Sequence, residues 1–154
     1  PELAVKMMNN IALSVENNPN YTTILSAQLE ETPDTTPDAI ATAARTLASE
    51  LDSPIIICYT ESGSTGVKVS RVRPKQIILT VTPVIETARK LTLVWGTECL
   101  VQKDALNLEK MINKTKLFSK RKKITKKGDK IVVTAGLPLK KPGTTNLIRV
   151  VKVD

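Results

Sequence analysis

A run of hydroxyl-bearing and small residues, Thr60–Thr65, directly follows the apolar stretch 54–59. Hydroxyl groups and backbone N–H groups are donors that suit an anion, and a helix starting after the run would add the free N–H groups of its first turn. Glycine lets the backbone approach a ligand closely. A phosphate-sized anion would therefore fit this loop. The candidate donors are the side chains of Thr60, Ser62, Ser64 and Thr65 and the backbone of Gly63.

Two features of this loop weigh against an anion. The run matches neither the GxGxxG fingerprint nor a Walker A motif, so it carries little specificity by itself. The carboxylate of Glu61 lies within the run and repels an anion unless it points away. A plain turn between a strand and a helix is therefore the alternative interpretation.

A second loop, Gly136–Thr145, contains two prolines, two glycines and the adjacent Lys140 and Lys141. It follows a predicted strand, and the carboxyl ends of parallel strands meet at one edge of a sheet. The two ammonium groups would then reach a second phosphate of a bisphosphorylated or nucleotide ligand. A solvated hairpin loop is the alternative.

The residue types present exclude several kinds of catalysis. The chain contains no histidine, and Cys58 and Cys99 form no CxxC pair. Zinc sites of the Cys/His type and an imidazole base are therefore excluded. Both cysteines lie in apolar runs and are expected to be reduced core thiols of a cytoplasmic protein. The acidic residues are scattered singly, so we expect a binding or regulatory module with no catalytic and no metal-binding residues.

Charge is unevenly distributed along the chain. Residues 1–109 carry 9 Lys/Arg and 13 Asp/Glu, whereas residues 110–154 carry 14 Lys/Arg and 2 Asp/Glu. The basic run Lys114–Lys127 indicates either an acidic partner or a solvated surface. Nucleic acid is not expected as a partner, because Phe118 is the one aromatic residue in the run and stacking platforms need more.

Membrane and secretion signals are not visible. No apolar run reaches the roughly 18 residues of a membrane-spanning helix, and no basic segment followed by an apolar one opens the chain. The first residue is proline rather than methionine, so we expect a fragment of a longer protein. A length of 154 residues makes one domain the default expectation.

The apolar periodicity predicts helices in the first third of the chain. Leu3–Glu16 repeats apolar residues at helical spacing. Thr36 is the predicted cap of a second helix, with Pro37 at its first position. The segment Tyr21–Asp34 between the two helices is ambiguous.

Three further helices are expected between the predicted strands. The first follows Ser64 and ends near Arg71. The second is capped by Thr82, opens at Pro83 and ends at a left-handed Gly96. The third is capped by Asp104.

Five strands complete the predicted domain. The last two are joined by a loop too short for a parallel crossover, so they should be antiparallel. The fold class is therefore α/β: a three-layer domain with a five-stranded, mostly parallel sheet, an antiparallel last edge strand and helices on both faces. The predicted strands are 54–60, 76–82, 98–102, 130–135 and 146–153.

Five short motifs, in order along the chain, resemble the C-terminal domain of pyruvate kinase. They are Thr60-Glu-Ser-Gly63, Ser70-Arg-Val-Arg-Pro74, Glu86-Thr-Ala-Arg89, Val94-Trp-Gly96 and Pro142-Gly-Thr-Thr-Asn146. The resemblance runs from about residue 35 to the end. Residues 1–16 are also similar to the last helix of the family's catalytic barrel. The resemblance therefore implies a junction helix over 1–20 and a C-terminal domain over 21–154.

The resemblance also implies a function. Pyruvate kinase transfers phosphoryl from phosphoenolpyruvate to ADP in glycolysis, and its Mg²⁺, K⁺ and catalytic residues belong to the barrel. This chain would then be inactive alone and would contribute regulation and homotetramer assembly in the cytoplasm. A phosphorylated sugar or nucleotide would be its effector. The effector-binding residues implied are Thr60, Ser62, Gly63, Ser64, Thr65, Lys140, Lys141 and Gly143.

Departures from the family pattern leave the effector's identity open. Ser64 stands where a basic or polar residue is usual, and Met111 is near the place of an arginine that some members use for a second phosphate. Two other hypotheses are kept: a free-standing domain that senses a phosphorylated ligand or acts as a partner subunit, and an independent enzyme with a new site.

Overall fold

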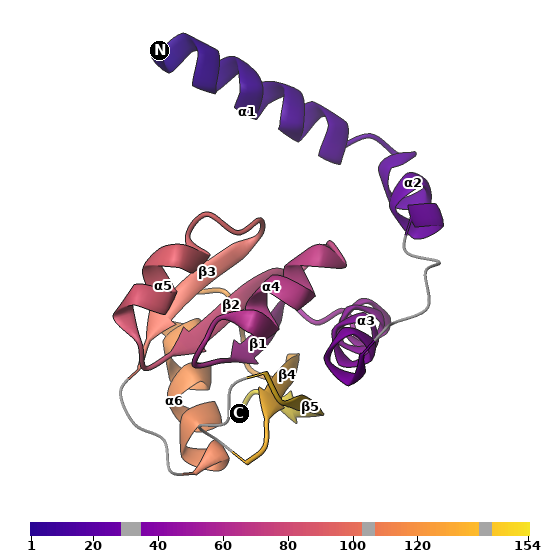
Figure 1. The fold of residues 1–154 in the computed structure, drawn as a ribbon. Helices are drawn as coiled ribbons and strands as arrows, with labels where there is room; N and C mark the ends of the chain where they lie inside the picture. Colours follow the sequence, from indigo (N-terminus) through magenta and orange to yellow (C-terminus); the bar gives the residue numbers. More distant parts are fainter. Residues whose placement is uncertain (29–34, 103–106, 139–142) are drawn as a thin grey trace. The chain divides into compact units, whose positions relative to one another are not determined.

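The computed structural model of the chain describes residues 1–28, 35–102, 107–138 and 143–154 (Figure 1). It comprises two compact units, Pro1–Thr32 and Pro33–Asp154. The first unit contains α1 (Glu2–Glu16), as predicted, and α2 (Tyr21–Gln28) in the segment that the sequence left ambiguous. The predicted division at residue 20 stays a prediction. Within the described residues, no helix has the length and apolarity that crossing a membrane requires.

The second unit alternates strands and helices and ends in a hairpin. Each predicted strand is present within a residue or two of its expected bounds. Its elements are α3 (Thr36–Glu50), β1 (Ile55–Tyr59), α4 (Ser64–Arg71), β2 (Ile77–Thr82), α5 (Ile85–Leu91), β3 (Thr97–Val101), α6 (Leu108–Arg121), β4 (Lys130–Gly136) and β5 (Thr145–Lys152).

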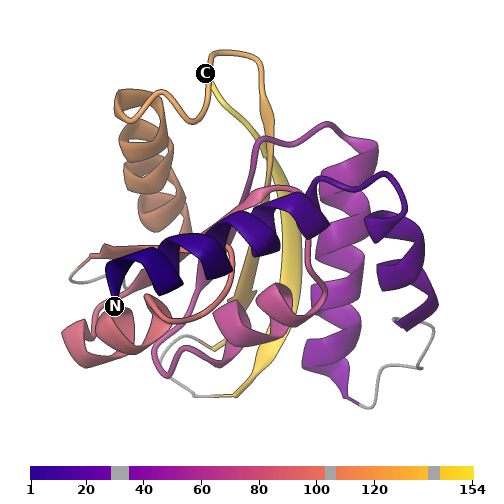
Figure 2. The same cartoon turned by 90° about the horizontal axis from the view of Figure 1, so that it is seen from above.

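The five strands form one sheet in the order β3-β2-β1-β4-β5 (Figure 2). β1 is the central strand and pairs in parallel with β2 on one side and with β4 on the other. β3 extends the parallel part beyond β2, and β5 pairs antiparallel with β4 at the edge. The predicted mostly parallel α/β sheet with an antiparallel last edge strand is confirmed.

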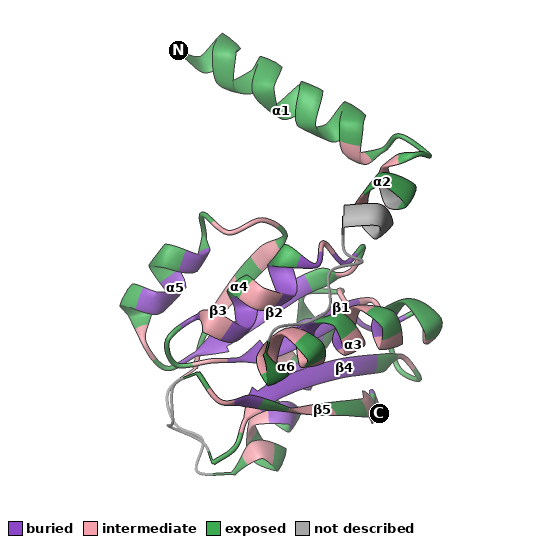
Figure 3. Ribbon diagram, turned by 45° about the vertical axis from the view of Figure 1, so that its right-hand side comes forward, coloured by how far each residue is buried: buried purple, intermediate pink, exposed green. Residues whose placement is uncertain are grey.

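The composition of β1 explains its central place. All five of its residues are buried, because both faces of the strand are covered (Figure 3). On one face Ile55, Ile57 and Tyr59 pack in a core cluster with Ile112 of α6. α3, α4 and α5 lie on the other face, and the small side chains of α3 allow its close approach. The buried residues of α3 are Ala41, Ala44 and Ala48.

Two helices begin at residues other than those predicted. Thr35, not Thr36, caps α3, because its extended backbone lets its hydroxyl accept the N–H of Asp38. α5 begins at Ile85, beyond the predicted opening at Pro83. Val84 still has extended backbone angles there.

The ends predicted for α5 and α6 were also inexact. α5 ends at Leu91, and Gly96 takes its predicted left-handed conformation (φ +68°) in the turn before β3 instead. Asp104 lies outside the described residues. The observed cap of α6 is Asn107, whose side chain accepts the N–H of Glu109.

Two of the family motifs join the end of α4 to the turn before β3. The hydroxyl of Ser70 donates to the carbonyl of Trp95 at 2.7 Å. The guanidinium of Arg73 lies 4.5 Å from the centre of the Trp95 ring, in cation–π contact. These residues therefore hold two loops together and have a structural role.

Gly66 is required by helix–sheet packing in this structure. It is buried in α4, and a Cβ atom there would lie 2.5 Å from the Cγ2 methyl of Thr80 on β2. Real Cβ contacts are almost never that short, so any larger residue forces α4 and β2 apart.

We therefore expect Gly66→Ala to destabilise the chain by about 1–2 kcal/mol, since overpacking outweighs the gain in helix propensity. Thr80→Ser removes the clashing methyl but keeps the hydroxyl that donates to Glu98. The double variant should recover most of the loss, measured by urea unfolding of the four proteins of the cycle. Strictly additive effects would contradict the packing argument.

Candidate functional site

The loops after β1 and β4 lie at a topological switch point. From β1 the chain proceeds to β2 on one side of the sheet, whereas β4 lies on the other side of β1. The carboxyl ends of β1 and β4 are therefore neighbours, and their following loops lead apart. Open α/β sheets bind ligands in the crevice at such a point. Thr60–Gly63 is one of the two loops, as the sequence predicted.

The loop after β1 is held by hydrogen bonds within the protein. The N–H of Gly63 donates to the Thr60 hydroxyl at 2.9 Å, and the carbonyl of Glu61 accepts from the Thr87 hydroxyl of α5 at 2.9 Å. Gly63 is the N-cap of α4 and has a left-handed backbone with φ +92°. This conformation disfavours other residues, so Gly63 sets the path of the chain into the helix.

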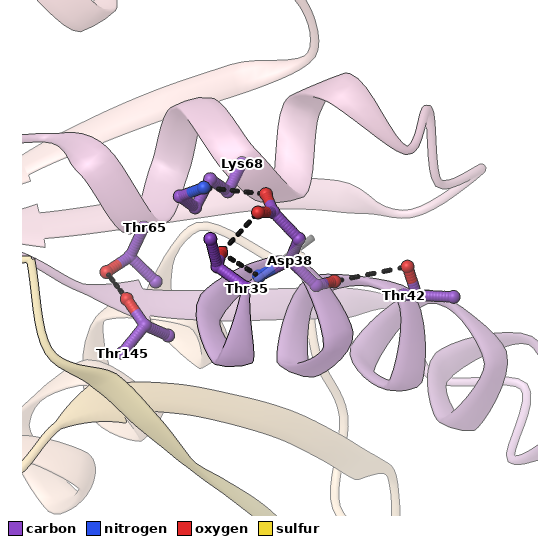
Figure 4. Close-up of polar contacts among 6 residues, drawn as sticks. All are labelled: Thr35, Asp38, Thr42, Thr65, Lys68 and Thr145. Carbon is purple, nitrogen blue, oxygen red and sulfur yellow. Dashed lines mark hydrogen bonds and ion pairs between the residues drawn. The ribbon is translucent and has the colours of Figure 1, made fainter. Parts of the chain in front are cut away.

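The hydroxyls of the loop face different surroundings. Ser62 is exposed and Ser64 half-buried, with their oxygens 3.2 Å apart. Thr65 is buried, and its hydroxyl lies 2.6 Å from that of Thr145 at the start of β5 (Figure 4). The backbone N–H groups of Thr65 and Gly66, in the first turn of α4, have no acceptor among the described residues. The hydroxyls of Ser62 and Ser64 are thus the donors exposed to a ligand, whereas Thr65 and Gly66 are buried.

A hollow of about 480 Å³ opens between α4 and α5 beside this loop. The loop contributes Ser62, Gly63 and Ser64 to its wall. The helices contribute Val67, Lys68, Arg71, Thr87, Lys90 and Leu91, and the turn after α5 contributes Val94.

Three cationic residues of the hollow were missed in the sequence. Lys68 and Arg71 follow Ser64 at four and seven residues, a spacing that places all three on one face of a helix. That spacing was a usable signal. Lys90 comes from α5, and its proximity depends on the packing of two helices, which no local pattern reveals.

Lys68 also connects α4 to α3. Its Nζ lies 2.6 Å from a carboxylate oxygen of Asp38, whose other oxygen accepts from the Thr35 hydroxyl (Figure 4). The hydrogen bond from Lys68, followed by that from Thr35, lowers the pKa of Asp38 below its ordinary value. The ion pair therefore joins the cap of α3 to the helix that begins at the candidate loop.

The loop after β4 is only partly described. At its base, the side chain of Asn146 accepts the N–H of Leu137 at 2.8 Å and donates to the carbonyl of Leu137 at 2.7 Å. Gly143 is exposed and left-handed, with φ +77°. The predicted ligand contacts of Lys140 and Lys141 lie outside the described residues.

The basic run predicted over 114–127 lies on the second half of α6 and the turn after it. Its one buried lysine, within the part of the chain that is described, is Lys116, whose ammonium pairs with Asp154 at 2.5 Å. Hydrogen bonding to Lys116 lowers the pKa of Asp154. An acidic partner for the remaining exposed lysines stays a prediction.

Reactive groups near the end of β1 are unsuited to acid–base or nucleophilic chemistry. Burial raises the pKa of the Cys58 thiol to about 12 and raises the pKa of Tyr59 as well. Cys58 and Cys99 are both free. Across the described ranges, His, Cys, Asp and Glu side chains form no group that could hold a metal ion.

The Asp38–Lys68 pair makes a testable contribution to acid stability. Because the folded pKa of Asp38 is below its ordinary value of 3.8, the contribution is complete above that value and is lost as the pH falls through the depressed pKa. Asp38→Asn should lower the free energy of unfolding at pH 7. Between pH 5 and pH 2 this free energy should fall less steeply in the variant than in the wild type, as measured by urea unfolding. Asp52→Asn, at the far end of α3, keeps the pair and should keep the wild-type slope; equal slopes for all three proteins would contradict this role.

Comparison with known proteins identifies the family of the chain. Residues 38–151 match the family described as "Pyruvate kinase, alpha/beta domain". A pyruvate kinase of Methylorubrum extorquens is 39% identical over 150 residues, covering 97% of this chain and 31% of the relative. The pyruvate kinase of Agrobacterium vitis is 35% identical, covering 99% of this chain and 32% of the relative.

A solved structure gives the same result. Cryptosporidium parvum pyruvate kinase in complex with ADP superposes with a TM-score of 0.79 at 28% identity, covering 88% of this chain and 27% of that chain. This chain thus spans about a third of the length of the relatives that it matches. It belongs to the pyruvate kinase family and corresponds to the alpha/beta domain of these proteins.

Proposed function

We propose that the chain is the regulatory and oligomerisation domain of a cytoplasmic pyruvate kinase and binds a phosphorylated effector at Thr60–Thr65. Coverage supports the assignment to a part of the enzyme, since the chain corresponds to only 31% of the Methylorubrum relative. The phosphotransfer, with its Mg²⁺ and K⁺, then belongs to the catalytic barrel, which is the partner of this domain.

The observation that carries the effector site is the set of open donors at the switch point. The Ser62 and Ser64 hydroxyls and the first-turn N–H groups of α4 gather where the loop leaves β1. The positive end of the helix dipole adds to their attraction for a dianion. The hydrogen bond between the hydroxyls of Thr65 and Thr145 joins the first turn of α4 to the start of β5.

The neighbourhood of the loop also bears on the predicted second phosphate. Met111 is partly buried and packs against the core cluster, so α6 presents no cation at that position. A second phosphate on that side would depend on Lys140 and Lys141, which remain predicted ligands. The Glu61 side chain is exposed at the surface, while its carbonyl is bound by α5.

A phosphate titration of the chain tests the effector site. Amide resonances of residues 62–66 should shift on addition of inorganic phosphate, fructose 1,6-bisphosphate, glucose 6-phosphate or AMP. Ser62→Ala/Ser64→Ala should weaken phosphate binding by about tenfold, because two hydrogen bonds to a charged group are lost. Ser14→Ala/Ser49→Ala, a pair of exposed helix serines, is the control. Binding that is unaffected in the first variant, or silent amides with all four ligands, would refute the proposal.

A further inference from the structure

The rim of the hollow between α4 and α5 is cationic. Lys68 and Arg71 of α4 and Lys90 of α5 line it, and no carboxylate is among its lining residues. Arg71 and Lys90 are exposed, so their charges are free to approach a ligand. The loop hydroxyls of Ser62 and Ser64 lie at the same opening. Hydrogen-bond donors from two helices and a loop therefore line this hollow.

The rest of the hollow is apolar. Val67, Leu91 and Val94 contribute aliphatic surface to it. Its volume of about 480 Å³ falls within the roughly 300–1,000 Å³ that is usual for small-molecule pockets. An apolar surface with cations at its rim suits a compact organic anion better than a polyhydroxylated sugar, whose hydroxyls would find few partners there.

We propose that this hollow receives the organic part of a phosphomonoester whose body is mainly apolar, and that the ligand draws Lys68 away from Asp38. The inference rests on the proposed phosphate-binding role of Thr60–Thr65. It places the ligand on the α4–α5 side of that loop, whereas Lys140 and Lys141 follow β4. Arg71 and Lys90 attract the phosphate from the rim, and Val67 and Val94 contact the apolar body.

Competition for Lys68 follows from the ion pair. The Lys68 ammonium lies 2.6 Å from Asp38, so a ligand phosphate and this carboxylate attract the same cation. Asp38 also accepts from the Thr35 hydroxyl, and Thr35 caps α3. A bound ligand would therefore loosen the first turn of α3, the first helix of the second unit. The first turn of α3 would therefore be the part of the chain that responds to ligand binding.

The experiment compares phenyl phosphate with inorganic phosphate on the 154-residue chain, by calorimetry and amide shifts. Phenyl phosphate should bind several-fold more tightly, and Val67→Ser should reduce that preference. Lys90→Ala should lower the affinity for phenyl phosphate by about threefold. Asp38→Asn should raise this affinity by about threefold, because the carboxylate that competes with the ligand for Lys68 is removed. The controls are Lys114→Ala, an exposed lysine of α6, and Asp52→Asn, which should match the wild type.

Opposite signs for Lys90→Ala and Asp38→Asn would support the inference. If both match their controls while Ser62→Ala/Ser64→Ala still weakens phosphate binding, the loop binds phosphate and the organic part of the ligand lies elsewhere, so only this inference fails. If phenyl phosphate responds to Lys90→Ala and Asp38→Asn but not to the serine variant, the hollow binds the ligand without the loop, which refutes the proposed effector site and the link to it inferred here. No binding of either probe refutes both.

Discussion

β1 is buried on both faces, and this burial determines how the other strands and the helices are arranged around it. Five consecutive residues, Ile55–Tyr59, are buried, and each large aliphatic side chain among them contributes roughly 1.5–3 kcal/mol by leaving water. A strand of this kind is stable only in the centre of a sheet with helices on both sides. Its central place puts β2 and β4 on opposite flanks, and this makes the loop at Thr60 a switch point. The candidate site is thus a geometric consequence of the core.

The loop that follows β1 is held from three directions. Thr87 of α5 holds the carbonyl of Glu61, Thr145 of β5 contacts Thr65, and Asp38 of α3 pairs with Lys68 of α4. A loop held in this way presents its open donors in one arrangement, so a ligand pays little to order them. The same contacts give a bound anion direct neighbours in α3, α5 and β5. Regulation through this domain would use those neighbours.

Much of the fold could be predicted because its signals are local. The continuous apolar runs identified the buried strands, and the short link before β5 required an antiparallel edge. The left-handed conformation predicted for Gly96 is present, although the helix before it ends earlier than predicted. Helix starts were less accurate. Thr35 and Thr36 are equally good caps by residue type, and only the backbone angles distinguish them.

The features that were missed depend on tertiary packing. The need for glycine at position 66 depends on Thr80 of the neighbouring strand β2, because a Cβ atom there would lie too close to the threonine methyl. Ser70 and Arg73 served as family markers, and their structural role appeared only with Trp95 beside them. Lys90 reaches the site from a different helix from Lys68. No periodicity within one segment could have brought these groups together.

A crystal structure of the chain grown with inorganic phosphate would show whether the loop after β1 is an anion site. We expect phosphate at the first turn of α4, within hydrogen-bond distance of the Ser62 and Ser64 hydroxyls and of the N–H groups of Thr65 and Gly66. Phosphate bound elsewhere in the same crystal, with this loop occupied by water alone, would contradict it.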